Sequence, residues 1–422
     1  MSFNPFKWCP DTFRVGNFLA FRALKRANIW TTILIVFIMT LTFLNLVFVS
    51  GILSGLVEGS SNAYRAQYSG DIILSNIESK NFIEDTANIE KTLWSFPEVV
   101  AITSRMLAGG SVEANYRNKS NVSDKTESVS AGIAGINPAS EDSVTHLADL
   151  IIAGEYLEKG DANGIIVGSN LLENYVRNIP GSDTLSIVDV GDTVRLRVNG
   201  TLREFTIRGV LKSKVAAVSQ RVYINDTILR QLLNRPGKDA NEIVAVLTPG
   251  TDAVYIKSEL EKTDICSCAK IETWEESQGQ FFKDIGTTFD ILGSVIGAIG
   301  ISVASITVFI VIFINAVTRR KYIGILQGIG VCPSAITISY ILQSLFYAFA
   351  GSAIGSAILF GFLKPYIDGN PIDFPFSDGI LVAPVDVTLI RIGLIIVVTI
   401  IAGYIPARII VGKNVLDSIL GR

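Results

Sequence analysis

The sequence predicts a membrane α-helical protein with four transmembrane helices and a large α+β extracytoplasmic domain inserted between helices 1 and 2. Two observations predict this fold class. Hydrophobic residues make up 49% of the 422 residues and charged residues 18%, with a mean hydropathy of +0.43, which is outside the range of ordinary soluble chains. The first of four long apolar stretches is also separated from the other three by residues 58–290, whose composition is that of a soluble domain.

Each of the four apolar stretches is long enough to cross a bilayer, since a spanning helix needs about 20 apolar residues. They occupy residues 29–57, 291–317, 333–363 and 387–407. The first is too long for the apolar part of a signal peptide, and no small-residue cleavage pattern follows it closely, so we interpret it as an uncleaved anchor. Pro333 favours the first turn of a helix and therefore marks the start of the third span.

The positions of the basic residues predict the orientation, because Lys and Arg accumulate on the cytoplasmic side of membrane proteins. The segment before the first span, the loop between the second and third, and the segment after the fourth hold eleven basic residues and two acidic ones (Lys7, Arg14, Arg22, Lys25, Arg26, Arg319, Arg320, Lys321, Arg408, Lys413, Arg422; Asp11, Asp417). We expect a multi-pass protein of the cytoplasmic (inner) membrane with both termini in the cytoplasm and residues 58–290 outside. Arg391 is the one charge inside a predicted span, and near the outer end of that span it can reach the interface.

The predicted domains follow from these spans. Residues 1–28 form a cytoplasmic N-terminal amphipathic segment, 29–57 the first transmembrane helix, 58–290 the extracytoplasmic domain, and 291–422 a second membrane domain with helices 2–4. Alternating apolar residues predict strands at 71–74, 99–106, 129–136, 164–167, 193–198, 205–211, 221–224 and 243–247. Helical spacing predicts helices at 89–96, 170–176, 226–233 and 252–262, and the polar stretch 118–128 predicts a loop.

Signatures of catalysis and of ligand binding are absent from the sequence. His146 is the only histidine, so we expect neither a His-based triad nor a His-rich metal site within one chain, and we expect His146 at the surface. Cys266 and Cys268 are too close for the usual zinc spacing; free thiols and a bridge to another chain are both open. A P-loop is missing, and a net charge of −3 gives no attraction for nucleic acid. We therefore expect no catalytic residue, no metal and no cofactor.

Pairs of glycines four residues apart recur in the predicted spans (Gly51 and Gly55, Gly293 and Gly297, Gly351 and Gly355). Such spacing lets helix backbones approach closely, which is how helices associate in lipid, where the hydrophobic effect gives no drive. The six residues are thus predicted helix-packing positions. Contact within one chain and a seam between two copies are both consistent with the pattern.

The loop between the second and third spans carries the most distinctive pattern, residues 318–334 (TRRKYIGILQGIGVCPS). Three basic residues at the membrane face precede aliphatic residues placed around small glycines, which predicts a short amphipathic helix at the cytoplasmic interface. Its candidate contact residues for a cytosolic partner are Arg319, Arg320, Lys321, Ile323, Gly324, Ile325, Leu326, Gly328 and Gly330. The alternative is a simple turn whose basic residues only set the orientation.

Residues 318–334 resemble the coupling segment of the FtsX-like permease domain, in which a basic run precedes an Ile-Gly-Ile-Leu stretch, and residues 403–408 (GYIPAR) resemble the closing motif of that domain. In the outer region, residues 132–138 (GIAGINP), 152–157 (IAGEYL), 164–168 (GIIVG), 190–194 (VGDTV) and 271–275 (IETWE) resemble, in order, motifs of the lipoprotein-releasing permeases LolC and LolE. The chain thus resembles an ABC transporter permease of the FtsX-like/MacB superfamily. Tyr322 and Gln327 depart from the coupling pattern, because the family more often has charged residues there.

The resemblance implies a non-catalytic permease subunit that passes mechanical work to a MacB-type periplasmic core domain at 58–290 through an FtsX-like domain at 291–422. A separate cytosolic ABC ATPase dimer would bind the ATP, and residues 319–330 would contact that dimer. A second permease subunit, the same chain or a sister chain, would complete the complex in membrane lipid, and lipid-modified or other hydrophobic clients would be released or exported. The alternative is an FtsX-like transmembrane signalling scaffold that regulates an extracellular cell-wall hydrolase.

Overall fold

The structure is a computed structural model that describes residues 11–77, 80–116, 127–176, 184–186, 188–263, 265 and 268–412. The chain divides into two compact units. Unit 1 comprises Met1–Leu56, Ile285–Ile372 and Gly379–Arg422, and unit 2 comprises Val57–Asp284 and Asp373–Asp378. Most of the predicted loop at 118–128, and Cys266, lie outside the described residues.

Four helical runs in the described residues are long and apolar enough to cross a membrane: Ile29–Ser69, Phe282–Thr318, Pro333–Gly369 and Val385–Val411. The prediction of four apolar helices is therefore confirmed. Three of the runs extend well beyond the predicted spans, because helix geometry continues through polar residues such as those at 58–69 and 282–290, which apolarity alone does not identify.

The helices of these runs and their neighbours have the following bounds: α1 Thr12–Lys25, α2 Ile29–Leu44, the π-helical turn η1 Asn45–Val49, α3 Ser50–Tyr64, the π-helical turn η2 Arg65–Ser69, α10 Gly279–Thr318, α11 Arg320–Gly328, α12 Pro333–Ile358, the π-helical turn η7 Leu359–Leu363, α13 Lys364–Gly369 and α14 Val385–Val411. Local sequence explains several helix starts. The side chain of Asn28 accepts a hydrogen bond from the backbone N–H of Trp30 at the start of α2, and Pro333 occupies the first turn of α12.

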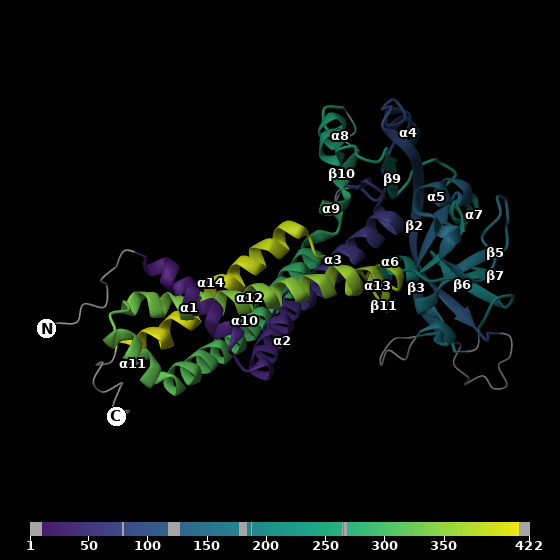
Figure 1. The fold of residues 1–422 in the computed structure, drawn as a ribbon. Coiled ribbons are helices and arrows are strands. Elements are labelled where there is room, and N and C mark those ends of the chain that lie inside the picture. The colour runs from purple at the N-terminus through teal and green to yellow at the C-terminus, as the bar shows by residue number, and fades with distance from the viewer. Residues whose placement is uncertain are drawn as a thin grey trace. The chain divides into compact units, whose positions relative to one another are not determined.

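In unit 1, α12 packs against α1, α2 and α14, and the long helices lie side by side (Figure 1). The core between them is apolar. Ile35, Met39 and Phe43 from α2 meet buried residues of α10, α12 and α14, and the outward faces of the same helices expose aliphatic and aromatic side chains. An interior and a surface that are both apolar are typical of a bundle whose solvent is lipid.

Unit 2 is built on a mixed sheet of ten strands in the order β10-β1-β9-β2-β3-β8-β5-β7-β4, with β6 pairing β2 and β7. The bounds are β1 Ile72–Asn76, β2 Val99–Ala114, β3 Glu127–Ile136, β4 Ile151–Gly154, β5 Gly164–Gly168, β6 Thr193–Val198, β7 Thr201–Leu211, β8 Arg221–Asn225, β9 Glu242–Leu247 and β10 Ala269–Thr273. A separate two-stranded sheet, β11 Ile372–Phe374 and β12 Ser377–Gly379, precedes α14 in the sequence.

The long strand β2 belongs to two parts of this sheet. Its first half, from Val99 to Arg105, pairs antiparallel with β9, and its second half, from Met106 to Ala114, pairs antiparallel with β3. Two apolar cores form accordingly, one around Ile72 and Ile243 and one around Val112 and Phe205. Unit 2 is therefore α+β with two lobes that share one strand.

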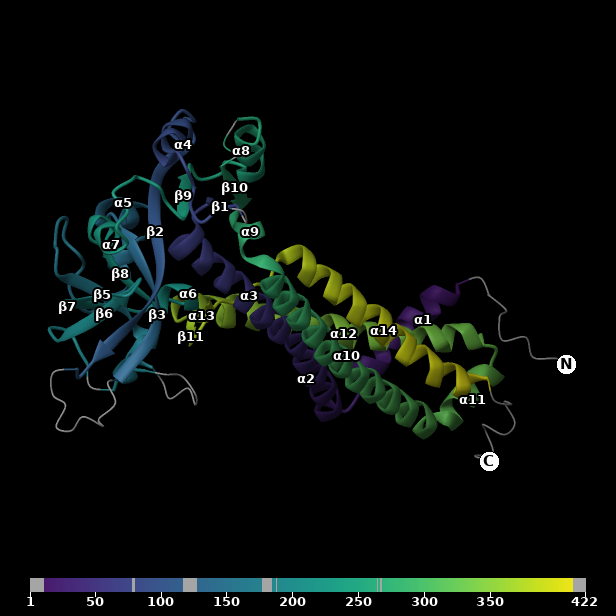
Figure 2. The ribbon, with the colours of Figure 1, turned by 180° about the vertical axis from the view of Figure 1, so that it is seen from behind.

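Short helices accompany the sheet: α4 Thr86–Leu93, α5 Pro138–Thr145, α6 Ala216–Ser219, α7 Asp226–Leu232, α8 Ala253–Leu260 and α9 Trp274–Ser277. In Figure 2 α7 lies beside β8, and in both views α8 lies beside β10. The predicted helix at 170–176 is wrong, because that stretch forms two separate 3-10 turns, Ser169–Leu171 and Glu173–Tyr175. Strands β4 and β10 and helix α5 were not predicted.

Candidate functional site

The candidate coupling segment, which we define as residues 319–330, forms the short helix α11 between two long helices. Arg319 precedes the helix, and its backbone oxygen accepts the hydrogen bond from the N–H of Ile323 at 3.0 Å. The helix ends where the N–H of Val331 bonds to the oxygen of Leu326 at 3.0 Å. Gly330 has φ +96°, a conformation that glycine adopts without the strain of a side chain, so the chain turns there and enters α12 at Pro333.

The apolar residues of α11 divide between the bundle core and the surface. Ile323 is buried in the core of unit 1, and Leu326 packs against that core. Ile325 and Ile329 are 53% and 74% exposed. The side chain of Gln327 also donates a hydrogen bond to the backbone oxygen of Val411 at 3.0 Å, which joins α11 to the end of α14. One face of the helix therefore anchors it, and the other exposes aliphatic side chains.

The three basic residues of the segment differ in their surroundings. Lys321 is exposed, whereas Arg320 is half-buried, and its Nε atom has no hydrogen-bond partner among the described residues. Arg319 borders a cavity of about 100 Å³ that is lined by residues of α1, α2, α10, α11 and α12. Of the remaining predicted contact residues, Gly324 is buried and Gly328 is exposed.

The six predicted packing glycines all lie against other parts of unit 1. A side chain at Gly351 would collide with Met39, and one at Gly355 would collide with Phe43, so α12 and α2 approach closely at both positions. A Cβ atom at Gly297 would lie 2.6 Å from Leu46, and one at Gly293 would lie 3.2 Å from the hydroxyl of Ser50. Gly51 and Gly55 face the backbone of residues 380–382. These contacts lie within one chain.

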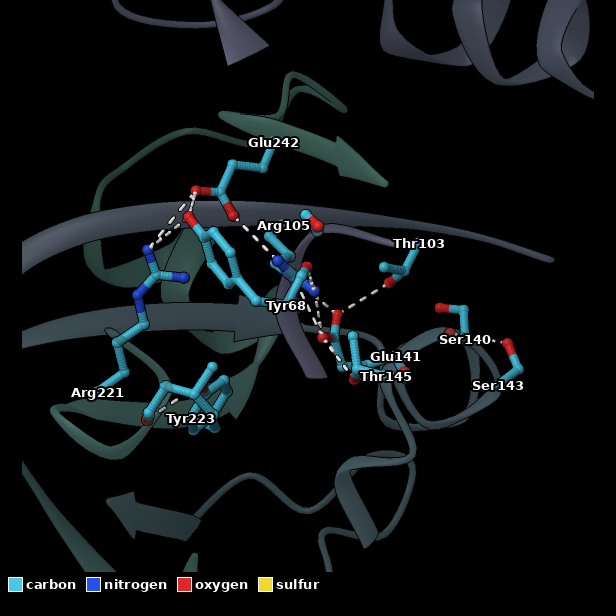
Figure 3. A network of polar contacts seen from close by, with 12 residues as sticks. Tyr68, Thr103, Arg105, Ser140, Glu141, Ser143, Thr145, Arg221, Tyr223 and Glu242 are labelled. Carbon is cyan, nitrogen blue, oxygen red and sulfur yellow. Dashed lines mark hydrogen bonds and ion pairs between the residues drawn. The ribbon is translucent and has the colours of Figure 1, made fainter. Parts of the chain in front are cut away.

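A buried network of charged residues, which no sequence motif indicated, lies inside unit 2 (Figure 3). Arg105 is 2% exposed and Glu141 is 1% exposed, and the guanidinium Nη2 of Arg105 donates to a carboxylate oxygen of Glu141 at 2.8 Å. Its Nη1 donates to Glu242 at 3.1 Å, and Arg221 approaches the other oxygen of Glu242 at 3.5 Å. We call these residues, with Tyr68, Thr103 and Thr145, the Arg105 network.

The charges and hydrogen-bonding groups of this network satisfy one another. Two arginines face two glutamates, and the hydroxyls of Thr103 and Thr145 donate to Glu141 at 3.1 and 3.0 Å. Burial alone would lower the pKa of Arg105, but Glu141 and Glu242 outweigh it and raise the pKa. Burial alone would raise the pKa of Glu242, but Arg221 and Arg105 hold it below its usual value. Arg105, Arg221 and Glu242 are therefore charged at neutral pH.

The Arg105 network holds the end of the helical run that begins at Ile29. Tyr68 lies in η2, the last turn of this run, and its hydroxyl donates to Glu242 at 2.6 Å. Arg105 donates to the backbone oxygen of Tyr68 at 2.9 Å, and its guanidinium carbon lies 5.3 Å from the centre of the Tyr68 ring. The end of this helical run is thus tied into the interior of unit 2.

Two further contacts hold the helices that enter unit 2. Arg65, also in η2, pairs with the buried carboxylate of Asp71, and Asp71 in turn accepts a hydrogen bond from the N–H of Leu247 at 2.7 Å. Just before α10, the side chain of Gln278 donates to the backbone oxygen of Ser61 at 3.4 Å. Both contacts join residues within unit 2.

The described residues hold no group of three or more His, Cys, Asp or Glu side chains that could bind a metal ion. His146 is exposed at the end of α5, and Cys268 is half-buried. The charged clusters that the structure does show are internally paired, which is the arrangement of a structural clamp rather than of a reactive centre.

Residues 294–415 match the family model described as FtsX-like permease C-terminal, which places α11, α12 and α14 inside the matched region. This part of the chain is an FtsX-like permease domain. This confirms the recognition made from the coupling segment and the closing motif. The match covers the membrane domain that bears the coupling segment, and the FtsX-like domain therefore includes the residues from Arg319 to Gly330.

A curated relative of this FtsX-like permease is the lipoprotein-releasing system transmembrane protein LolC of Haemophilus influenzae, which is 23% identical over 280 residues, or 65% of this chain. The alignment spans 66% of LolC, slightly less than two thirds of its length. Two solved structures are similar to part of the chain. The periplasmic region of MacB from Actinobacillus actinomycetemcomitans matches with 16% identity and a TM-score of 0.35, covering 51% of this chain and 93% of that one. The extracellular domain of YknZ from Gram-positive bacteria matches with 12% identity and a TM-score of 0.31, covering 48% and 99%.

Proposed function

We propose that the chain is the permease subunit of an ABC transporter. In this proposal it couples ATP hydrolysis by a separate cytosolic ATPase to movement of an extracytoplasmic domain, residues 58–290. The observation that carries the proposal is the build of α11, which is fixed to the bundle through Ile323 and Leu326 and exposes Ile325 and Ile329 for a partner. Aliphatic side chains exposed beside basic ones at a membrane interface suit a protein partner that binds in the cytosol.

The orientation in this proposal rests on charge. α11 starts at Arg320 and follows Arg319, and α1 ends at Lys25, so these basic residues gather at one end of unit 1. Basic residues favour the cytoplasmic face, which puts α11 in reach of a cytosolic ATPase and both termini in the cytoplasm of a cell with this chain in its inner membrane. The ATPase would be a dimer, and two permease chains, identical or sister, would carry it.

The mechanical step follows from the contacts of unit 2. A displacement of the first helical run reaches Tyr68 and Arg65, whose partners Glu242 and Asp71 lie on or beside the strands of unit 2. Because these partners are buried, the contacts resist stretching more than exposed pairs would. Unit 2 therefore moves with the helix as a body. The clients proposed for this movement are lipoproteins or other hydrophobic molecules, by analogy with LolC, whose name describes lipoprotein release.

Reconstitution with an ATPase tests the proposal. The permease in lipid nanodiscs is mixed with the ABC ATPase encoded nearest to it, and binding and ATP hydrolysis are measured for the wild type and for Ile325→Ser/Ile329→Ser. We expect binding at least about tenfold weaker in the double variant, because central apolar contacts are worth more than about 1.4 kcal/mol together.

The matched control for this experiment is Val385→Ser, which removes a 65% exposed aliphatic side chain from the first turn of α14 instead. It should bind the ATPase like the wild type. If the Ile325/Ile329 variant binds the ATPase as tightly as the wild type does, the coupling role proposed for α11 is contradicted. Stimulated hydrolysis with no lipid-modified client bound, but a stable extracellular hydrolase in the complex, would favour the signalling scaffold instead.

A further inference from the structure

The cavity bordered by Arg319 differs from the rest of unit 1 in its polarity. It has a volume of about 100 Å³ and lies where α1, α2, α10, α11 and α12 meet. Polar side chains from four of these helices line it, including Asn28, Thr31, Asn315, Arg319, Ser339 and Tyr340. Among the described residues that line it, Arg319 is the one charged residue and none is acidic. The cavity therefore carries a net positive charge.

Tyr340 shows that this cavity has an unused hydrogen-bonding group. Its side chain lines the cavity and only 7% of the residue is exposed, yet its hydroxyl has no hydrogen-bond partner among the described residues. The neighbouring Tyr347 differs, because it shares a hydrogen bond with Thr32. A hydroxyl that opens on a cavity can donate to a group bound there, so a ligand atom that accepts from Tyr340 would be bound favourably.

The N-terminal turn of α2 adds to the positive potential. Asn28 and Thr31, at the start of this 16-residue helix, both line the cavity. The first N–H groups of a helix point outward at its N-terminus and favour a negative charge there. Lys25 and Arg26, at the end of α1, precede this turn in the chain. A cation, a helix N-terminus and an unpaired hydroxyl therefore converge on one small space, which is a donor set for a phosphate group.

The surface around this cavity indicates the source of the phosphate. Trp30 and Ile33, in the first turns of α2, are 77% and 53% exposed, and Phe18 and Phe21 of α1 are exposed as well. Exposed aromatic and aliphatic residues beside a polar cavity suit acyl chains below a headgroup. A free phosphate would leave this apolar surface uncovered.

We propose that this cavity binds the headgroup of an anionic phospholipid of the inner leaflet, with Arg319 and Tyr340 holding its phosphate. The acyl chains lie along Trp30 and Ile33. Since the headgroup contacts residues of α2, α10 and α12 beside the first turn of α11, it fixes the position of the coupling segment. This last consequence rests on the proposed function, whereas the binding of the lipid does not.

Lipid titration of the delipidated permease in a neutral detergent tests the binding. Dioleoyl phosphatidylglycerol, dioleoyl phosphatidylcholine and inorganic phosphate are added separately, and the bound lipid is counted by native mass spectrometry. We expect phosphatidylglycerol to bind at least about tenfold more weakly to Arg319→Gln, which loses a charge-assisted hydrogen bond. Tyr340→Phe loses one neutral hydrogen bond and should bind it about fivefold more weakly.

The matched control is Arg22→Gln, which removes an exposed positive charge from α1 but none of the lining of the cavity. Its affinity should stay within about twofold of the wild type, since an exposed charge outside the site contributes little. Phosphatidylcholine, which has no net charge, should bind more weakly than phosphatidylglycerol to the wild type. The proposal is overturned if Arg319→Gln and Tyr340→Phe, both shown to be folded by their melting curves, bind phosphatidylglycerol like the wild type. It is equally overturned if millimolar inorganic phosphate displaces the lipid, since the site would then be one for free phosphate.

Because the titration needs no ATPase, its outcome is independent of the coupling experiment. Loss of lipid binding in Arg319→Gln with normal ATPase binding would confirm the lipid site and separate it from the partner surface of Ile325 and Ile329. If Arg319→Gln instead keeps its lipid binding and loses ATPase binding, the lipid site is contradicted and Arg319 belongs to the partner surface.

Discussion

The two units of the molecule bury arginine in opposite ways. In unit 2, Arg105 meets the carboxylates of Glu141 and Glu242 and is almost wholly buried. In unit 1, Arg391 of α14 is half-buried, and its hydrogen bonds go to neutral groups, the hydroxyl of Ser50 at 3.0 Å and the backbone oxygen of Val47 at 3.5 Å. In unit 2 nearby carboxylates neutralise the buried arginine, whereas in unit 1 the arginine keeps its charge unpaired among the described residues and can extend toward the membrane interface.

This difference predicts which kind of substitution destabilises each unit. The interior of unit 2 depends on charge balance, because removal of one partner leaves another charge buried and unpaired. The interior of unit 1 depends on volume, because glycines such as Gly351 and Gly355 let two helices meet with no space for a side chain. Three substitutions, in order of decreasing expected effect, test this contrast.

The largest effect is expected for Arg105→Met. The substitution keeps much of the side-chain volume but leaves Glu141 without a counter-charge and Glu242 with Arg221 alone, which costs about 3–5 kcal/mol of the free energy of unfolding. Denaturant unfolding of the full chain in detergent, followed by the fluorescence of Trp94 and Trp274 in unit 2, measures it.

The control for this substitution is Arg208→Gln, which breaks a pair with Asp161 whose arginine side chain is 53% exposed. Exposed pairs contribute about 0–1 kcal/mol, so the control should unfold close to the wild type. Equal unfolding of both variants would mean that the Arg105 network does not stabilise unit 2.

Gly351→Ala is expected to act on unit 1 instead. The new methyl group would collide with Met39 and approach the backbone of Thr40, and such overpacking costs about 1–3 kcal/mol. Thermal melting of the purified chain, read from loss of helical circular dichroism, should show a lower midpoint. Gly393→Ala in α14 is the matched control, because no atom lies within 4 Å of the added methyl group, and alanine favours a helix over glycine by about 1 kcal/mol. A midpoint for Gly351→Ala as high as that of Gly393→Ala would contradict close packing at this contact.

The smallest effect concerns the response of unit 2 to acid. Burial alone would raise the pKa of Glu113, but hydrogen bonds from Arg197 and Arg195 outweigh it and hold the pKa below its usual 4.5. A carboxyl with a depressed folded pKa stabilises the fold fully above its unfolded pKa, and this stabilisation is lost as the pH falls from 4.5 through the folded value. Glu113→Gln should therefore be less stable than the wild type at pH 7, and the difference should narrow in acid.

Unfolding midpoints measured by fluorescence between pH 7 and pH 3 give this difference directly. Glu155→Gln, which neutralises an exposed carboxylate of the same unit, serves as the control and should follow the wild type. A difference between Glu113→Gln and the wild type that stays constant over this pH range would exclude the ionised pair as its cause.

The sequence predicts the bundle better than the interior of unit 2, and the reason is the range over which each pattern extends. An apolar span is a local property, and so is the amphipathic pattern of α11, in which a basic start precedes the buried Ile323 and the exposed Ile325. The pair of Arg105 and Glu141 joins residues 36 positions apart, and that of Arg105 and Glu242 joins residues 137 positions apart. Neither pair has a local signal, because each forms only after β2 has paired with β9 and α5 has packed against β2.

Other features were missed for physical reasons that single residues illustrate. The apolar residues around Leu171 and Leu172 have helical spacing, but Leu171 ends one turn, Leu172 lies between that turn and the next, and both are buried in the core of unit 2. Tertiary packing thus overrides the local pattern. Tyr340 looked like an ordinary residue of an apolar span, and its polar surroundings appear only when five helices are brought together.

The π-helical turn Arg65–Ser69 has a consequence for which deletions homologous chains can accept. Such a turn is equivalent to one residue inserted into an α-helix, so loss of a single residue there would restore regular α geometry. Each residue of an α-helix advances by about 100° around its axis, and Tyr68 would then point away from Glu242. Homologous chains with that one-residue deletion would keep an unbroken helix but would lose the hydrogen bond from Tyr68 to Glu242. Alignments of homologous chains should therefore tolerate gaps on either side of residues 65–69 more readily than within them.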